Sequence, residues 1–145
     1  MTRNSVAAIA ATVAVTVVVV LGFRMLGSPA NQRLIQADLR VTQALVNLAE
    51  QIQFRWKNSQ NTLPQTLDTI PASAKENPIT HEAFIYRVQS KSDYELCTTF
   101  ATDNRDAEKR EARNQWDPAR WAHPKGQSCF QLDASQPVPQ APYAY

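Results

Sequence analysis

An uncharged, apolar run from Val6 to Phe23 constrains this chain more than any other feature. As a helix with a rise of ~1.5 Å per residue, the run is about 27 Å long, close to the thickness of the hydrocarbon core of a bilayer. The sequence therefore predicts a transmembrane helix over residues 6–26, preceded by a short cytoplasmic segment of residues 1–5. The lipid bilayer is thus the first expected partner.

Two alternatives to a membrane anchor remain open. A cleavable signal peptide is one, because Arg3 precedes the run and Ser28-Pro29-Ala30 loosely resembles a cleavage site. The run is longer than the roughly 7–15 apolar residues of a signal peptide, and the proline is poorly placed for cleavage, so the anchor is the favoured interpretation. A buried helix of a soluble protein is the other alternative.

Two features of the sequence bear on the orientation of the anchor, and they favour opposite orientations. Arg24, Arg33 and Arg40 outnumber Arg3 and the amino terminus, which by itself favours a cytoplasmic domain. The short N-terminal flank and the expected pairing of the two cysteines favour the opposite orientation. We expect a single-pass protein of the inner (plasma) membrane, with a cytoplasmic N-terminus and a periplasmic or extracellular C-terminal domain.

Composition limits the functions open to this domain. The chain has 145 residues, which leaves about 100 for one small domain after the anchor and the tail. A net charge of +2 gives no electrostatic case for a nucleic-acid partner. Only three glycines are present, and phosphate-binding loops and nucleophile elbows are missing from the sequence. The sequence therefore predicts a non-enzymatic protein without a cofactor or a small-molecule substrate.

A long amphipathic helix is expected to follow the anchor, because the chain from Ala30 to Asn58 holds neither glycine nor proline. Apolar residues recur there at spacings of three, four or seven, which predicts one buried stripe. A coiled-coil seam is less favoured, since the segment is too short for enough heptads. The stripe consists of Leu34, Val41, Leu45, Leu48, Ile52 and Trp56.

Three strands are expected next, at residues 84–88, 94–100 and 128–132, because these segments are rich in aromatic and β-branched residues. They predict a small antiparallel sheet with one face packed on the helix, and hence an α+β domain over residues 30–132. Alternation along the strands places Cys97 and Cys129 together on the face away from the helix. A structural disulfide is the predicted result.

Other chemistry for the cysteines and histidines is less favoured. A reactive thiol assisted by His123 would need an activating environment, and no Cys-x-x-Cys motif is present. His81 and His123 lack the ligand spacing of a zinc site, and the aspartates lack the pattern of a calcium loop, so no metal site is predicted.

The segment between the second and third strands is long and should contain structure of its own, such as a short helix that Asp103 caps. We interpret its aromatic part as a flap whose tryptophans cover the sheet or the disulfide. Trp116, Trp121 and His123 are the candidate partner-binding residues. The proline-spaced tail, residues 133–145, is predicted to be disordered or extended.

The order of these parts resembles the pseudopilins of type II secretion and the wider type IV pilin-like class. A membrane helix continues into an amphipathic one, a Leu-Pro turn follows, and Asn-Pro precedes a strand with alternating aromatic residues. The resemblance covers roughly residues 30–100 and implies a pilin-like fold and a role in protein assembly. The matching positions are Asp38, Leu39, Ala44, Leu45, Leu63, Pro64, Leu67, Asn77, Pro78, Phe84 and Tyr86.

One departure from the pilin-like class concerns processing. Precursors of that class carry Gly-Phe-Thr-Leu-x-Glu before the apolar run, whereas here the run follows Arg3-Asn4-Ser5 and the Gly22-Phe23 pair lies at its far end. We therefore expect a pilin-like domain on a plain anchor, a structural or interaction protein with an envelope protein as partner. A subunit of a secretion or pilus machine and an exported enzyme or thiol protein are the alternatives.

Overall fold

The computed structural model describes residues 12–22, 29–105 and 121–141 of the chain. The chain divides into two compact units, Met1–Arg33 and Leu34–Tyr145. In the first unit, residues 12–22 are helical, and the hydroxyl of Thr16 donates a hydrogen bond of 2.8 Å to the carbonyl of Thr12. Among the helices described, none has the length and apolar character needed to cross a membrane. Residues 6–11 and 23–26 of the expected anchor lie outside the described ranges.

The long helix α2 runs from Pro29 to Asn58 and confirms the helix expected from residue 30. Proline suits the first turn, where its missing N–H would have no partner within the helix. At the other end, Gln60 and Asn61 adopt positive φ angles of 53° and 58°, and the amide of Asn61 donates to the carbonyl of Trp56 at 3.1 Å. This backbone reversal ends the helix. Its buried residues are Asp38, Val41, Thr42, Leu45, Val46, Leu48, Ala49 and Ile52.

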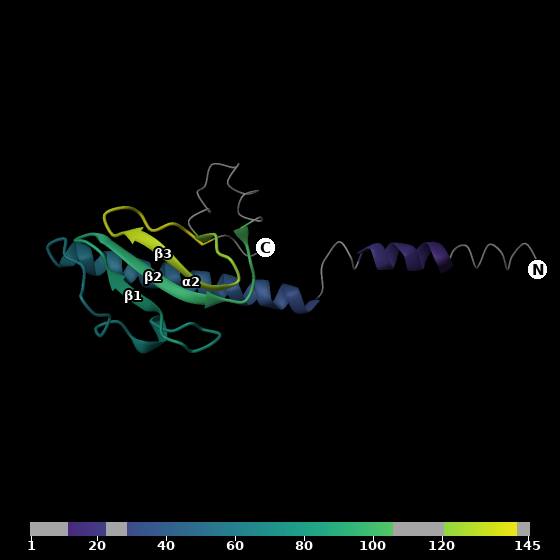
Figure 1. Cartoon of the computed structure of the whole chain (residues 1–145), viewed down its shortest axis with the longest axis horizontal. Coiled ribbons are helices and arrows are strands. Elements are labelled where there is room, and N and C mark those ends of the chain that lie inside the picture. Colours follow the sequence, from purple (N-terminus) through teal and green to yellow (C-terminus); the bar gives the residue numbers. More distant parts are fainter. Residues whose placement is uncertain (1–11, 23–28, 106–120, 142–145) are drawn as a thin grey trace, which may run out of the picture. The chain divides into compact units, whose positions relative to one another are not determined.

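Three antiparallel strands form one sheet in the order β1-β2-β3, as the sequence predicts. They are β1 (Ile85–Val88), β2 (Asp93–Phe100) and β3 (Gly126–Asp133). The strand β3 begins two residues before the expected start, because Gly126 still pairs with Phe100. In Figure 1 the sheet lies along α2, which passes behind all three strands. The second unit is thus an α+β domain.

The hydrophobic core lies between α2 and one face of the sheet. Alternate residues of β2 and β3 point into it, while those between them point to the other face, as period-2 geometry requires. Leu45, Leu48 and Ile52 of α2 are fully buried opposite the sheet. The strand residues of the core are Tyr94, Leu96, Phe100, Phe130 and Leu132.

The chain between α2 and β1 closes one side of this core. Leu63, Leu67 and Ile70 are buried there, before the short 3-10 helix η1 (Ala72–Ala74). Tyr86 of β1 donates a hydrogen bond of 2.8 Å from its hydroxyl to the carbonyl of Pro64. Partial burial raises the pKa of Tyr86 to about 12, so this donor keeps its proton at neutral pH.

For the segment after β3 the sequence predicts a disordered or an extended chain. Residues 133–141 lie on the domain, with Ala134 buried and Val138 and Ala141 packed against the core. Gln53 of α2 donates from its side-chain amide to the carbonyls of Ala134 (3.2 Å) and Gln136 (2.5 Å). Proline spacing indicated an extended chain without a period, but it does not show whether side chains elsewhere supply donors to its carbonyls. Residues 134–141 therefore fit the extended alternative of the prediction and not the disordered one, and 142–145 lie outside the described residues.

Candidate functional site

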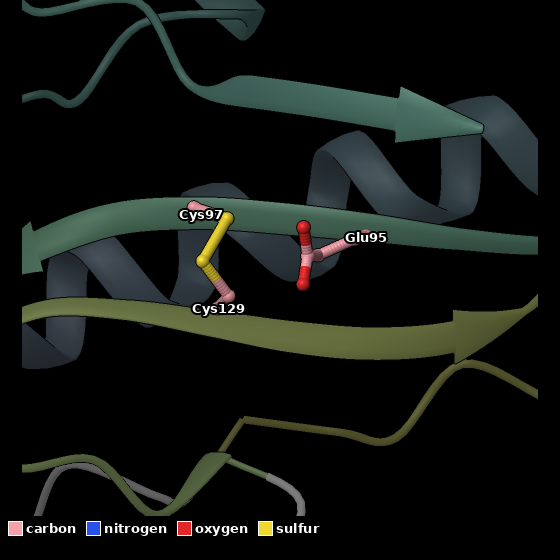
Figure 2. Close-up of side chains that lie close together, drawn as sticks. All are labelled: Glu95, Cys97 and Cys129. Carbon is pink, nitrogen blue, oxygen red and sulfur yellow. A yellow bond between two sulfur atoms is a disulfide. The ribbon is translucent and has the colours of Figure 1, made fainter. Parts of the chain in front are cut away.

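The disulfide between Cys97 and Cys129 joins β2 to β3 and confirms the predicted pair. The two residues face each other directly in the strand register, with their Cα atoms 4.0 Å apart. Figure 2 shows the bridge on the face of the sheet turned away from α2. The two cysteines differ in exposure, because Cys97 is 1% exposed whereas Cys129 lies exposed on the outer strand.

A carboxylate lies beside the two sulfur atoms. Glu95 is two residues before Cys97 on β2 and therefore shares its face, and its carboxylate oxygen and both sulfurs lie within 4.8 Å of one another. Arg87, the residue opposite Glu95 on β1, forms an ion pair with it at 3.2 Å. The side chain of Glu95 is 16% exposed and that of Arg87 is 63% exposed, so water solvates the cation far more than the anion.

This cluster has the donor atoms of a metal site, since thiolates and carboxylates both bind divalent cations. In the oxidised protein, however, the two sulfurs are bonded to each other and are not thiolate ligands. The arrangement is therefore a disulfide with a neighbouring charge.

The candidate partner-binding residues lie in the interior. Trp121 is 0% exposed and His123 is 1% exposed, and Trp116 lies outside the described residues. The ring centroids of Trp121 and Phe130 are 4.9 Å apart. The indole N–H of Trp121 donates a hydrogen bond of 3.0 Å to the carbonyl of Pro139. A side chain buried in this way presents no contact surface, so the partner-binding role predicted for Trp121 and His123 is wrong. Trp121 instead packs on the core face of the sheet, which agrees with its interpretation as a cover.

His123 lies in a polar cluster at the end of the core. Its ring stacks on Phe100 with centroids 3.6 Å apart, and its amide donates to the side chain of Asn104 at 2.7 Å. Burial lowers the pKa of His123 from its usual 6.5, although the nearby carboxylates of Asp38 and Asp103 oppose this shift. The ring is therefore neutral at physiological pH and part of the packing.

Asp38 is a buried carboxylate that fastens α2 to the chain after β2. Its oxygens accept hydrogen bonds from the amides of Ala101 (2.9 Å) and Thr102 (2.7 Å) and from the hydroxyl of Thr102 (2.5 Å). The sequence offered one signal for this role, because Asp38 is three residues before Val41 and seven before Leu45 on the apolar stripe. A charged residue at a core position requires partners from another segment.

Asn77 fastens the loop before β1 to the sheet in a similar way. Its side-chain amide donates to the hydroxyl of Thr98 at 3.1 Å, and its carbonyl oxygen accepts from the amides of Ile79 (2.9 Å) and Thr80 (3.2 Å). The residue is 1% exposed, so these bonds satisfy a polar group that water does not reach. Asn77 has a structural role.

Apolar side chains are exposed near the beginning of α2. Leu34 is 45% exposed and Ile35 is 42% exposed, whereas the residues of the apolar stripe from Val41 to Ile52 are buried in the core. We call these two residues the N-terminal α2 surface. Exposed aliphatic side chains at adjacent positions of a helix make this surface a candidate for contact with an apolar partner.

Comparison of the chain with family models, with curated proteins and with solved structures gives no significant match.

Proposed function

We propose that this chain is a membrane-anchored, extracytoplasmic structural or interaction protein of pilin-like type, without enzymatic activity. The observation that carries the proposal is the N-terminal α2 surface. Leu34 and Ile35 stay exposed on the same helix whose stripe residues Val41, Leu45, Leu48 and Ile52 are buried. A helix that buries one part of its apolar stripe in its own domain and leaves another part uncovered is suited to hold a partner.

The apolar run of residues 6–23 supports the membrane anchor. It is uncharged throughout and reaches to within a few residues of α2. An anchor of this kind would keep the N-terminal α2 surface near the membrane, where the partner is an envelope protein with an apolar helix or groove. The proposed anchor and the proposed partner thus both concern the N-terminal α2 surface, because the anchor would hold this surface close to a partner in the membrane.

The disulfide supports the extracytoplasmic location. Bridges of this kind form and persist in oxidising compartments such as the periplasm or the cell exterior, whereas cytosolic thiols are kept reduced. Closing a loop with a sequence separation of 32 residues stabilises a small domain by about 3–4 kcal/mol in the chain-entropy model. The bridge thus suits a domain with a modest core.

Site-specific photo-crosslinking tests the proposed contact surface. A photoreactive residue at position 34 or 35 of the full chain should give a discrete cross-linked product in the native membrane. Position 54 is the matched control, because Phe54 is 69% exposed on the same helix but lies away from the N-terminal α2 surface in sequence. Equal products from positions 34, 35 and 54, or none from any of them, would contradict the proposal.

A pseudopilin-like subunit of a secretion or pilus machine is the second candidate. The long helix followed by a three-stranded antiparallel sheet favours it, together with the order of motifs that resembles this class. The absence of the processing motif before the apolar run argues against it. N-terminal sequencing of the mature protein decides, since a subunit of this kind is processed and a plain anchor keeps residues 1–5.

A further inference from the structure

The disulfide offers incoming thiols one accessible end. Cys129 is exposed on the outer strand β3, whereas Cys97 is 1% exposed on the central strand β2. Exchange begins when a thiolate attacks one sulfur along the S–S axis and the other sulfur leaves as a thiolate. Access therefore favours attack at Cys129 Sγ, with Cys97 Sγ as the leaving group.

Glu95 places a negative charge close to both reacting sulfurs. Its carboxylate lies within 4.8 Å of them, on the same face of the sheet, as Figure 2 shows. The charge acts on two steps of the exchange, because it repels an approaching thiolate and disfavours the negative charge that develops on Cys97 Sγ. Since the side chain of Glu95 is mostly shielded from water, screening of this charge is incomplete.

Arg87 opposes part of this effect. Its guanidinium pairs with Glu95 at 3.2 Å but is 63% exposed, so solvent weakens its compensation. Among the described strand residues, the neighbouring positions on this face carry uncharged side chains, which are Thr99, Gln127 and Gln131. The local field at the sulfurs is therefore negative.

The geometry points to Glu95 as a residue that makes the disulfide selective among thiols, protecting it from anionic thiols and leaving it more open to neutral or cationic ones. The reaction proceeds in two exchanges. A thiolate RS⁻ attacks Cys129 Sγ, the S–S bond breaks, and Cys97 leaves as a thiolate that takes a proton from water. A second RS⁻ attacks the sulfur of R in the mixed disulfide, so that RSSR forms and Cys129 leaves as a thiolate. Two thiols are thereby oxidised and the protein disulfide is reduced by two electrons.

Reduction kinetics of the folded full chain test this inference. The probes are glutathione (net negative), 2-mercaptoethanol (neutral) and cysteamine (net positive), each compared at equal thiolate concentration. Glu95→Gln should accelerate reduction by glutathione about fivefold to tenfold and change the rate with cysteamine much less. Arg87→Gln, the matched control, should slow glutathione, because it leaves the carboxylate without its counter-charge.

Three outcomes would overturn the inference. A uniform acceleration by Glu95→Gln with all three thiols would mean that the substitution acts on the leaving Cys97 thiolate or opens the strands, so that Glu95 does not discriminate between thiols by their charge. The inference would also be overturned if neither variant changed the ratio of the glutathione rate to the cysteamine rate. For the unsubstituted protein, added salt should raise the glutathione rate by screening the carboxylate, and a salt-independent rate would contradict this role of Glu95.

The site of attack has its own readout. Brief treatment with glutathione, followed by alkylation and peptide mapping, should place glutathione on Cys129 and the alkyl label on Cys97. The reverse assignment would contradict the proposed direction of attack. Because none of these measurements involves a membrane or a protein partner, they succeed or fail independently of the proposed function.

Discussion

Two parts of the same helix have similar apolar residues and opposite surroundings. Around Leu34 and Ile35 the aliphatic side chains of α2 are exposed, whereas Leu45, Leu48 and Ile52 are completely buried under the sheet. Both parts belong to one apolar stripe, in which Asp38 occupies the position between Leu34 and Val41. Periodicity therefore identifies the face of a helix that can be covered, but it does not show how much of that face the domain covers itself.

Asp38 lies where the exposed part gives way to the buried part. It is the first buried residue along α2, and its carboxylate receives three hydrogen bonds from the chain that follows β2. This contact holds one end of the sheet at a fixed place on the helix. The comparison thus teaches that the core begins at a polar contact, and that the domain leaves the apolar residues before it exposed.

The largest effect in this comparison should come from the buried part. Leu48→Ala removes a side chain that is fully enclosed, which should lower the free energy of unfolding by about 2–5 kcal/mol. Leu34→Ala is the matched control and should change it by less than about 0.5 kcal/mol, because its side chain is already in water. Chemical denaturation of the full chain measures both. Similar losses for the two variants would abolish the distinction between the two parts of the helix.

A somewhat smaller loss is expected at the boundary residue. Asp38→Ala leaves the amides of Ala101 and Thr102 without their acceptor and should cost about 2–4 kcal/mol of stability. Asp38→Asn keeps one acceptor oxygen and should cost less. The same denaturation experiment provides the values. An alanine variant as stable as the native protein would show that Asp38 does not hold the sheet on the helix.

The smallest effect concerns pH and the histidine near this boundary. Because the pKa of His123 is lowered in the folded protein, the unfolded chain binds a proton near pH 6.5 that the folded chain does not bind. Stability should therefore fall as the pH drops from 7.5 through 6.5, and level off once the lower pKa of the folded state is passed. Thermal unfolding between pH 7.5 and 5 follows this change.

Two variants separate His123 from other titrating groups. His123→Phe keeps an aromatic ring that can stack on Phe100 and should flatten the pH dependence in this window. His81→Asn alters an exposed histidine at a positive φ of 60°, a conformation that asparagine tolerates, and should leave the pH dependence in place. If His81→Asn abolished the dependence and His123→Phe preserved it, the assignment to the buried ring would be wrong.

Local patterns predicted those parts of the fold that depend on neighbouring residues. Absence of glycine and proline marked α2, and alternation along two strands placed Cys97 and Cys129 on one face and hence in a disulfide. The same patterns failed where distant segments meet. The sequence leaves Trp121 open either as a cover of the sheet or as a partner-binding residue, because nothing nearby in sequence shows that Pro139 supplies the acceptor for its indole N–H.

The sequence predicts only part of the candidate site for the same reason. Period and register predict the cross-strand pair, and the same period places Glu95 on the face of the cysteines. Its proximity to the sulfurs, and the difference in exposure between Cys97 and Cys129, depend on which strand is central and which is at the edge. Strand order is a tertiary property, so no window of sequence contains it.

Labelling of the cysteines in intact cells tests the central claim most directly. Cells that express the full chain are treated with dithiothreitol and then with a membrane-impermeant maleimide, and a sample without the reductant serves as the control. The account predicts labelling of the exposed Cys129 only after reduction and without cell lysis. Labelling that requires lysis, or free thiols before any reductant is added, would contradict an oxidised domain held outside the cytoplasm.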